Sequence, residues 1–203
     1  MDEELPKGLV LVPEFVSKGE ERELVRFIEG IEFRTIRMHG VTAKRRVKQF
    51  GWHYAFESYQ LTETDPIPEL FAGIRERSAG LAGIATAEWA EALVTEYAAG
   101  AGIGWHRDAP AFGMVAGVSL KSECRMRFRK DGDGGERVVS AVDLLPRSLY
   151  LLTSEVRTQW QHMIPPAREL RYSITFRTLH PRNTSGIRAM RSREKGSESD
   201  ILN

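Results

Sequence analysis

The second half of the chain is divided into short segments of strand length, and this pattern restricts the fold more than any other feature. From Thr95 onward, apolar or alternating runs are separated by Gly, Pro and Asp, which favour turns. The predicted strands cover residues 115–120, 124–129, 137–144, 148–152, 159–164 and 171–179. Many short strands in succession favour a β-sandwich or jelly roll over alternating β-α-β units.

The first half of the chain predicts helices beside these strands. Residues 8–16 form a short apolar run interrupted at Pro13, which is typical of a strand. Ser17 followed by Glu20 is a capping-box pattern and predicts the start of an amphipathic helix. Apolar residues at helical spacing, with prolines near the start, predict a second helix over 66–81.

Composition and motifs exclude several classes of protein. Lys and Arg (29) nearly balance Asp and Glu (28), so an anionic partner must bind a local patch. The single cysteine, Cys124, excludes an intramolecular disulfide and fits a reducing compartment. The sequence shows no secretory signal and no apolar run of membrane-spanning length, so we expect a cytoplasmic protein. It also lacks C-x-x-C and H-E-x-x-H zinc patterns, a G-x-S-x-G nucleophile elbow and a Walker A loop.

One candidate metal-binding pattern lies in G-W-H-R-D at 104–108. In a strand, His106 and Asp108 point to the same face, so an imidazole and a carboxylate can bind one ion. They are two of the three ligands in the 2-His-1-carboxylate set, which binds Fe(II) and leaves positions open. His162 is the best candidate for the third ligand. A lone H-x-D also occurs by chance, and a histidine beside a Pro-Pro turn is often a partly buried hydrogen-bonding residue.

Residues 171–177, R-Y-S-I-T-F-R, predict an amphipathic strand with an arginine at each end. One face would carry Arg171, Ser173, Thr175 and Arg177, and the apolar face would carry Tyr172, Ile174 and Phe176. Two inward arginines beside a metal would suit a small dicarboxylate, because a guanidinium binds a carboxylate bidentately. An exposed strand with two surface arginines accounts for the same pattern.

Basic residues are concentrated in two other places. Residues 34–48 contain six basic side chains and no acidic one, and they run into Phe50, Trp52 and Tyr54. Basic and aromatic residues together can hold phosphates and stack bases. A solvated hairpin with half-buried aromatics explains this stretch equally well. Residues 125–129 alternate Arg with Met and Phe, so three arginines would share one face of a strand, either in a substrate groove or at an exposed surface.

Taken in order, these motifs resemble the AlkB family of Fe(II)/2-oxoglutarate-dependent dioxygenases, whose usual pattern is H-x-D, a distal His and R-x-N-x-T-x-R. The resemblance runs from about Gly8 to His180 and includes E-Y-A-A-G-A-G-I-G-W-H-R-D, V-S-L-K-S-E-C-R-M-R-F and L-P-R-S-L-Y-L-L-T-S-E-V-R-T-Q-W-Q-H. With V-K-Q-F-G-W-H-Y, the chain looks closest to the branch that contains the tRNA wobble-uridine hydroxylase domain and bacterial DNA-repair relatives. The resemblance implies a mainly β fold with flanking helices, a double-stranded β-helix (jelly roll) with an N-terminal nucleotide-recognition lid.

The resemblance also implies roles for particular residues. Fe(II) would be bound by His106, Asp108 and His162. The residues expected to bind 2-oxoglutarate are Tyr97, Ile103, Arg171, Ser173 and Arg177, with Arg171 on the distal carboxylate and Arg177 beside the metal-proximal one. The candidate substrate-binding residues are Trp52, His53, Tyr54, Arg45, Arg46 and Arg127. No catalytic side chain is expected beyond the metal site.

The expected organisation is an N-terminal extension with helices and lid (1–92), a catalytic core (93–180) forming one domain with it, and a polar, disordered tail (181–203). Four positions depart from the family pattern. Ser173 and Thr95 stand where Asn is usual, and Lys121 replaces an expected Gly. Pro110 stands where the best-known repair enzyme has an acidic, base-contacting residue, so the substrate preference stays open.

The resemblance implies oxidative demethylation of N-alkylated bases such as 1-methyladenine and 3-methylcytosine, in single- or double-stranded DNA or in tRNA, with release of formaldehyde, succinate and CO₂. We expect the protein to be a monomer and to have no membrane partner. Three alternatives remain: hydroxylation of a modified tRNA base, hydroxylation of a protein side chain, and a non-enzymatic β-sandwich binding module in which the H-x-D is accidental.

Overall fold

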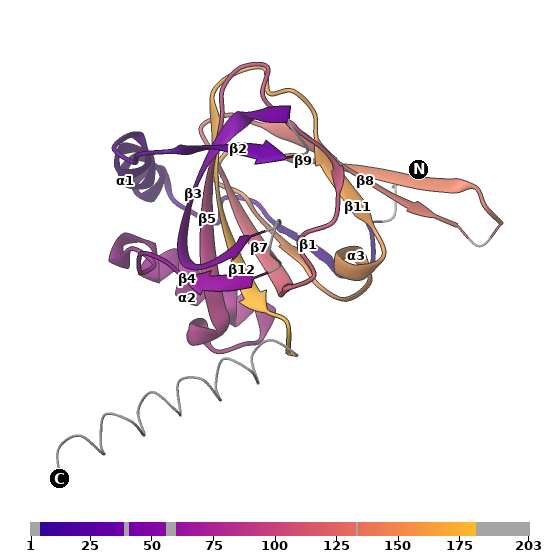
Figure 1. Cartoon of the computed structure of the whole chain (residues 1–203), viewed down its shortest axis with the longest axis horizontal. Coiled ribbons are helices and arrows are strands. Elements are labelled where there is room, and N and C mark those ends of the chain that lie inside the picture. Colours follow the sequence, from indigo (N-terminus) through magenta and orange to yellow (C-terminus); the bar gives the residue numbers. More distant parts are fainter. Residues whose placement is uncertain (1–4, 39–40, 56–59, 133, 182–203) are drawn as a thin grey trace, which may run out of the picture.

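Two antiparallel sheets form the body of the protein in the computed structural model, which describes residues 5–38, 41–55, 60–132 and 134–181 (Figure 1). The large sheet has the order β1 (Leu9–Val12), β10 (Leu149–Leu152), β7 (Phe112–Leu120), β12 (Arg171–Leu179), β5 (Trp89–Tyr97), β3 (Val41–Ala55) and β2 (Arg34–Met38), with β4 (Gln60–Glu63) paired to β3. The small sheet has the order β6 (Ile103–His106), β11 (Gln161–Ile164), β8 (Cys124–Asp131) and β9 (Arg137–Leu144). The predicted double-stranded β-helix is confirmed.

Helices cover one side of the large sheet, as Figure 1 shows for α1 (Lys18–Glu29) and α2 (Ala72–Ala82). The predicted capping box is present at the start of α1. The hydroxyl of Ser17 accepts from the Glu20 amide at 3.1 Å, and the Glu20 carboxylate accepts from the Ser17 amide at 2.8 Å. The second predicted helix begins later than expected, with a single turn, η1 (Glu69–Phe71), before α2. Two short elements were not predicted: η2 (Thr86–Glu88) and α3 (Ser154–Thr158).

The main apolar core lies between these helices and the large sheet. Ile28 from α1 and Phe71 from η1 are fully buried against Ile174 and Phe176 of β12. Each such side chain contributes roughly 1.5–3 kcal/mol through burial. The apolar face predicted for residues 171–177 is therefore core, and the opposite, polar face is turned toward the space between the two sheets.

That inner face is arranged in rows, because neighbouring strands are in register. Arg171 of β12 is opposite Tyr97 of β5, and Arg177 is opposite Glu91. Between these rows, Ser173 faces Thr95 across the same strand pair. Strand β3 continues the rows on the other side of β5. Polar groups from distant parts of the chain therefore lie side by side in the interior.

The N-terminal part and the β-rich part share one sheet. The expected division at residues 92 and 93 falls inside β5, and β2 and β3 from the N-terminal part extend the large sheet beyond β5. Residues 182–203 of the expected tail lie outside the described residues. Within the described ranges, the helices lack the length and apolarity needed to cross a membrane.

Candidate metal and co-substrate site

The two histidines of the candidate metal site lie on adjacent strands of the small sheet. His106 of β6 and His162 of β11 are direct cross-strand partners, and their ring centroids are 4.3 Å apart. The Nδ1 atom of His106 is 2.9 Å from the Gly104 carbonyl oxygen, which can accept a hydrogen bond from a proton on this nitrogen. That hydrogen bond fixes the ring and leaves Nε2 as the free nitrogen, the arrangement usual for a metal-binding histidine.

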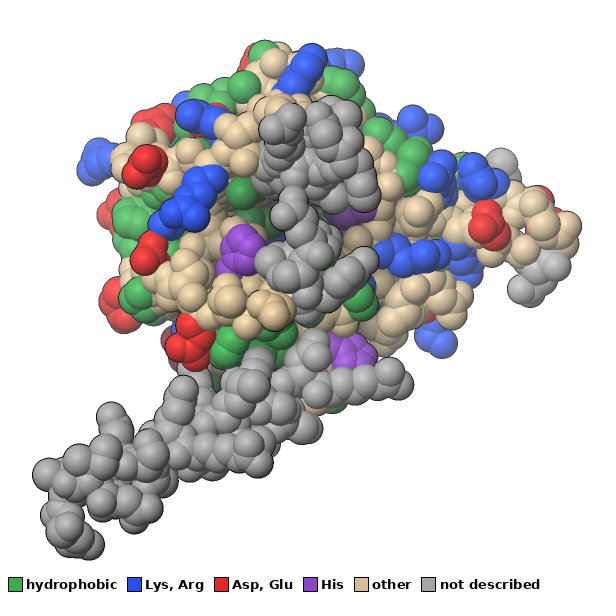
Figure 2. Space-filling model, viewed as in Figure 1, with side chains coloured by type: hydrophobic (Ala, Val, Ile, Leu, Met, Phe, Trp, Pro, Cys, Tyr) green, Lys and Arg blue, Asp and Glu red, His purple; other side chains and the backbone are tan. Residues whose placement is uncertain are grey.

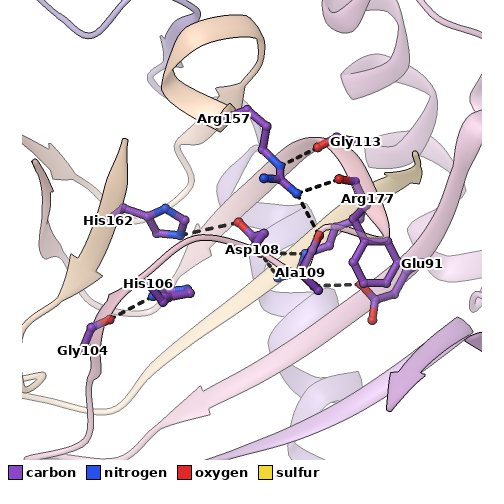
Figure 3. A network of polar contacts seen from close by, with 10 residues as sticks. Glu91, Gly104, His106, Asp108, Ala109, Gly113, Arg157, His162 and Arg177 are labelled. Atoms are coloured by element: carbon purple, nitrogen blue, oxygen red, sulfur yellow. Dashed lines mark hydrogen bonds and ion pairs between the residues drawn. The ribbon is translucent and has the colours of Figure 1, made fainter. Parts of the chain in front are cut away.

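The Asp108 side chain approaches the two histidines from the loop that follows β6. Strand β6 ends at His106, so strand alternation does not orient Asp108, and that detail of the prediction is wrong. Instead, Arg177 holds the carboxylate: its Nε and Nη2 donate to Oδ1 at 2.9 and 2.7 Å. The other oxygen, Oδ2, lies 3.6 Å from Nε2 of His162 (Figure 3). One oxygen is thus engaged by the arginine and the other is directed toward the histidines.

The protonation states of these groups suit a metal ion. Burial lowers the pKa of His162 to about 3 and also lowers that of His106, so both rings are neutral at pH 7. Burial alone would raise the pKa of Asp108, but the positive charge of Arg177 outweighs this effect and lowers the pKa. Two neutral imidazoles and one carboxylate are the ligand set expected for Fe(II).

The three side chains lie close together but are not yet in the geometry of a metal site. Among the described residues, no three His, Cys, Asp or Glu side chains are already arranged to hold a metal ion. Asp108 Oδ2 lies 3.6 Å from His162 Nε2, and the tilted His106 and His162 rings have centroids 4.3 Å apart, so the three candidate ligands are already close together. A bound ion would draw these donor atoms together, and the donor types fit Fe(II).

Arg171 provides a site for an anion deep between the sheets. Its side chain is fully buried, and its Nε donates to the Ser119 hydroxyl at 3.1 Å. Nη1 and Nη2 are buried and lack a hydrogen-bond partner within the described part of the chain. A buried guanidinium without an anion is costly, so these two donors fit the distal carboxylate of 2-oxoglutarate. The Tyr97 ring centroid lies 5.1 Å from the guanidinium carbon, so the two residues are neighbours.

A cavity of about 630 Å³ connects the candidate metal ligands with the Tyr97 ring, while Arg171 itself is not among its lining residues. A volume of this size is typical of a ligand site. Its wall includes the three candidate metal ligands and four of the residues expected to bind 2-oxoglutarate: Tyr97, Ile103, Ser173 and Arg177. Thr95 and Ser173, which replace the family's asparagines, face each other in this wall, and their shorter side chains leave space that a water molecule can bridge.

The hairpin of β3 and β4, where the lid is expected, brings only some of the candidate substrate residues to the cavity. Arg45, His53 and Tyr54 line it, together with Arg34 of β2. Trp52 is half-buried in the β3–β4 pair and is not among the lining residues.

Arg46 and Arg127 face other surfaces. Because side chains alternate along β3, Arg46 lies on the side of the strand away from the cavity, where it pairs with Glu96 at 2.7 Å. Arg127 is exposed on β8 and lines a separate, open hollow of about 1120 Å³ that contains none of the candidate metal ligands. Figure 2 shows several Lys and Arg side chains, together with acidic ones, on the projecting hairpin of β8 and β9.

Two charged residues that were not singled out from the sequence support the Asp108 loop. Glu91 is buried, and one of its oxygens accepts from Arg177 Nη1 at 2.8 Å. Arg157 of α3 donates to the carbonyl oxygens of Gly113, Ala109 and Phe112 at 2.6 to 3.0 Å (Figure 3). A charged residue within the otherwise apolar run W-A-E-A-L-V was the available sign for Glu91. Nothing comparable distinguished Arg157.

The backbone conformation of Lys121 explains why the family pattern has a glycine at this position. Lys121 has φ of 72°, in the left-handed region that favours glycine. Its amide donates to Glu21 and its ammonium pairs with Glu29, each at 3.0 Å. These contacts with α1 offset the strain of a non-glycine residue at this turn. Pro110, two residues beyond Asp108, is exposed.

Comparison with known proteins agrees with the geometry. Residues 8–177 match the family model of the 2OG-Fe(II) oxygenase superfamily. The chain is 29% identical over 182 residues to an alkylated DNA repair protein ALKBH8 homolog from Arabidopsis thaliana, covering 78% of this chain and 51% of that protein. It is 31% identical over 173 residues to the tRNA (carboxymethyluridine(34)-5-O)-methyltransferase ALKBH8 of Mus musculus, covering 82% of this chain and 25% of that protein.

The chain thus spans about half of the first relative and a quarter of the second. The solved structure of OsALKBH1 shares the fold, with a TM-score of 0.68 at 17% identity, covering 87% of this chain and 99% of that one. A family match over this length removes the alternative of a non-enzymatic binding module. The chain belongs to the 2OG-Fe(II) oxygenase superfamily and is an AlkB-like dioxygenase that uses Fe(II), 2-oxoglutarate and O₂.

Proposed function

We propose that this enzyme oxidatively demethylates N-alkylated nucleic acid bases, such as 1-methyladenine and 3-methylcytosine, in DNA and RNA. The products would be the repaired base, formaldehyde, succinate and CO₂. The observation that carries this proposal is the position of His53 and Tyr54 in the wall of the cavity that also contains His106, Asp108 and His162. Aromatic side chains beside an oxidising metal are suited to stack on a base.

In this proposal, each part of the cavity has a separate task. His106, Asp108 and His162 in the cavity wall would hold the iron. Arg171, which is buried next to Tyr97 of that wall, would hold the far carboxylate of 2-oxoglutarate. With its co-substrates bound, the iron supplies an oxidant strong enough to hydroxylate the N-methyl group. The protein residues position the methyl group and exclude water, and no protein acid or base is required for this step.

The location of the metal site requires the base to leave a duplex. The side chains of His162 and Asp108 are only 10% and 6% exposed, so a base stacked in a duplex cannot reach them. The target base would therefore be flipped out or arrive in a single strand. Arg34 and Arg45 place positive charge along the same wall, where it would favour an anionic nucleic acid.

Hydroxylation of a modified tRNA base is the second candidate. It is favoured by the name of the Mus musculus relative, which acts on a tRNA uridine. This chain aligns with only 25% of that protein, so the methyltransferase activity in the name need not belong to the aligned part. Both candidates use the same iron chemistry and differ in the base and in the nucleic acid that carries it.

A substrate comparison distinguishes the two candidates. The enzyme, with Fe(II), 2-oxoglutarate and O₂, is incubated with single-stranded DNA, duplex DNA and tRNA that carry N-methylated bases, and the nucleosides are measured by mass spectrometry. We expect loss of methyl groups with release of formaldehyde, most rapidly on single strands. The His106→Ala variant is the control and should be inactive.

Two results would contradict the demethylase proposal. One is addition of a hydroxyl group to a tRNA uridine while every N-methylated base is left intact, which would support the second candidate. The other is conversion of 2-oxoglutarate to succinate without change in any nucleic acid, which would exclude both candidates.

A further inference from the structure

Glu91 is a buried carboxylate that none of the expected roles explains. It lies in β5 with 1% of its surface exposed, and it contributes to the wall of the cavity. Its position is set on both sides by strand pairing, with Arg177 of β12 opposite it on one side and Gly51 of β3 on the other. Burying a carboxylate is costly unless it is paired. Arg177 supplies the charged partner of Glu91, and the Gln49 side chain supplies a further hydrogen bond.

Arg177 connects Glu91 to the candidate iron ligand. Its Nη1 donates to Glu91 at 2.8 Å, while its Nε and Nη2 donate to Asp108 Oδ1 at 2.9 and 2.7 Å. The guanidinium therefore uses three of its N–H groups on two carboxylates, as Figure 3 shows. Its planar shape means that fixing Nη1 also fixes the two donors on the opposite edge.

The balance of charge among Glu91, Arg177 and Asp108 affects how strongly Asp108 can bind a metal ion. One positive charge is shared between two carboxylates. If Arg177 were paired with Asp108 alone, its full charge would act on that carboxylate and compete with a cation for it. Burial raises the pKa of Glu91, and the charge and hydrogen bond of Arg177 oppose that rise. In its ionised form, Glu91 compensates part of the arginine charge on the side away from the metal site, and Asp108 keeps more negative charge for the ion.

We propose that Glu91 is a positioning residue that acts through Arg177 to orient Asp108 and to preserve its strength as an iron ligand. This inference rests on the assignment of Asp108 as a ligand, which is part of the proposed function. It is independent of the substrate, because it concerns only the binding of the metal. The partners behind a metal ligand typically change metal affinity by about 10- to 100-fold when they are removed.

Metal affinity of the Glu91→Gln variant tests this role. Gln has nearly the same shape and can still accept from Arg177, but it lacks the charge. Fe(II) is titrated anaerobically into each protein at saturating 2-oxoglutarate, and binding is followed by the visible charge-transfer band. We expect the dissociation constant of Fe(II) to rise about tenfold for Glu91→Gln, at the lower end of the range for such partners.

Two further variants separate positioning from a structural role. Glu96→Gln is the matched control, because Glu96 lies on the same strand and pairs with Arg46 on the opposite face. It should bind Fe(II) as the unaltered enzyme does. Glu91→Asp keeps the charge but shortens the side chain, and it should lose less Fe(II) affinity than Glu91→Gln. Thermal unfolding of all three variants shows whether each is folded.

The results distinguish failure of this inference from failure of the site assignment. Unchanged Fe(II) affinity in Glu91→Gln overturns the inference, and so does an equal loss in Glu91→Asp, which would indicate a role of shape alone. If Glu91→Gln does not fold, Glu91→Met, which is uncharged and of similar length, takes its place, and unaltered Fe(II) affinity in that variant overturns the inference. If Asp108→Ala binds Fe(II) normally, the assignment of the ligand itself is wrong.

Discussion

Arg171 illustrates how much a single buried side chain can restrict the ligand. Two of its guanidinium nitrogens are buried without a partner among the described residues, and a carboxylate bound to both would satisfy them. Replacement by Lys keeps a positive charge but removes the bidentate geometry. We expect the Michaelis constant for 2-oxoglutarate to rise about tenfold in Arg171→Lys, which corresponds to the loss of roughly one charged hydrogen bond. Steady-state kinetics with varied 2-oxoglutarate measures this constant.

The control for this substitution is Arg125→Lys. Arg125 pairs with Asp143 at the surface, with more than half of each side chain exposed, and should leave the kinetics unchanged. An unchanged Michaelis constant in a folded Arg171→Lys protein would contradict the assignment of the co-substrate site.

His162 predicts a specific dependence of stability on pH. Burial lowers its pKa to about 3, whereas in the unfolded chain it returns to about 6.5. Between these values the unfolded state binds a proton that the folded state does not, so stability is complete above about pH 6.5 and is lost as the pH falls toward 3. One such proton contributes a slope of at most about 1.4 kcal/mol per pH unit.

Denaturant unfolding of the metal-free protein at several pH values from about pH 7 to about pH 4 measures this slope. We expect a shallower decline for His162→Gln, because Gln carries no titrating group. Equal slopes for the two proteins would show that His162 is not kept neutral by the fold.

At the scale of the elements, the bend in β3 depends on Gly51. This residue has φ of 80°, and a Cβ built on it would lie 2.1 Å from the Ala90 carbonyl oxygen. Both the left-handed backbone and the close approach of β5 disfavour a side chain there. We expect Gly51→Ala to lower the free energy of unfolding by more than about 2 kcal/mol in denaturant titrations.

Gly83, at the end of α2, is the matched control for this substitution. It has φ of 68°, but a Cβ there would meet nothing within 4 Å. Gly83→Ala should therefore cost only about 1 kcal/mol, the conformational part alone. An equal loss of unfolding free energy at the two positions would show that the contact with Ala90 adds nothing to the effect of Gly51→Ala.

Elements governed by local rules could be predicted from the sequence. The alternation in residues 171–179 predicted β12 with the correct ends, and the capping box located the start of α1. Both depend on residues close together in the chain. By contrast, α3 has only five residues, too few for a helical pattern, and it was missed.

Features governed by tertiary pairing could not be predicted in the same way. Whether Arg45 or Arg46 faces the cavity depends on how β3 pairs with β5, and the sequence does not give this register. The orientation of Asp108 depends on Arg177, which lies 69 residues further along the chain. The family motifs identified Asp108, but the support from Glu91 required the pairing of β5 with β12.

At the scale of the whole molecule, the site exists only where the two sheets meet. The small sheet supplies His106 and His162, and the large sheet supplies Arg171 and Arg177. Ligands that bind this junction should therefore stabilise the folded protein and not the unfolded chain. Mn(II) and 2-oxoglutarate together, each at about 100 times its dissociation constant, should each contribute up to about 2.7 kcal/mol, seen as a higher melting temperature.

His106→Ala should abolish most of this stabilisation by the metal, whereas Glu96→Gln, on the outer face of the large sheet, should retain it. A rise in melting temperature that is the same for both variants would indicate that the metal binds elsewhere.

The most direct measurement is a crystal structure with Mn(II), which replaces Fe(II) without redox chemistry, and 2-oxoglutarate. Anomalous scattering locates the metal independently of any model. We predict Mn(II) bonded to His106, Asp108 and His162, with the distal carboxylate of 2-oxoglutarate on the two free nitrogens of Arg171. A metal bound away from these three residues, or a carboxylate that leaves Arg171 without a partner, would contradict the account.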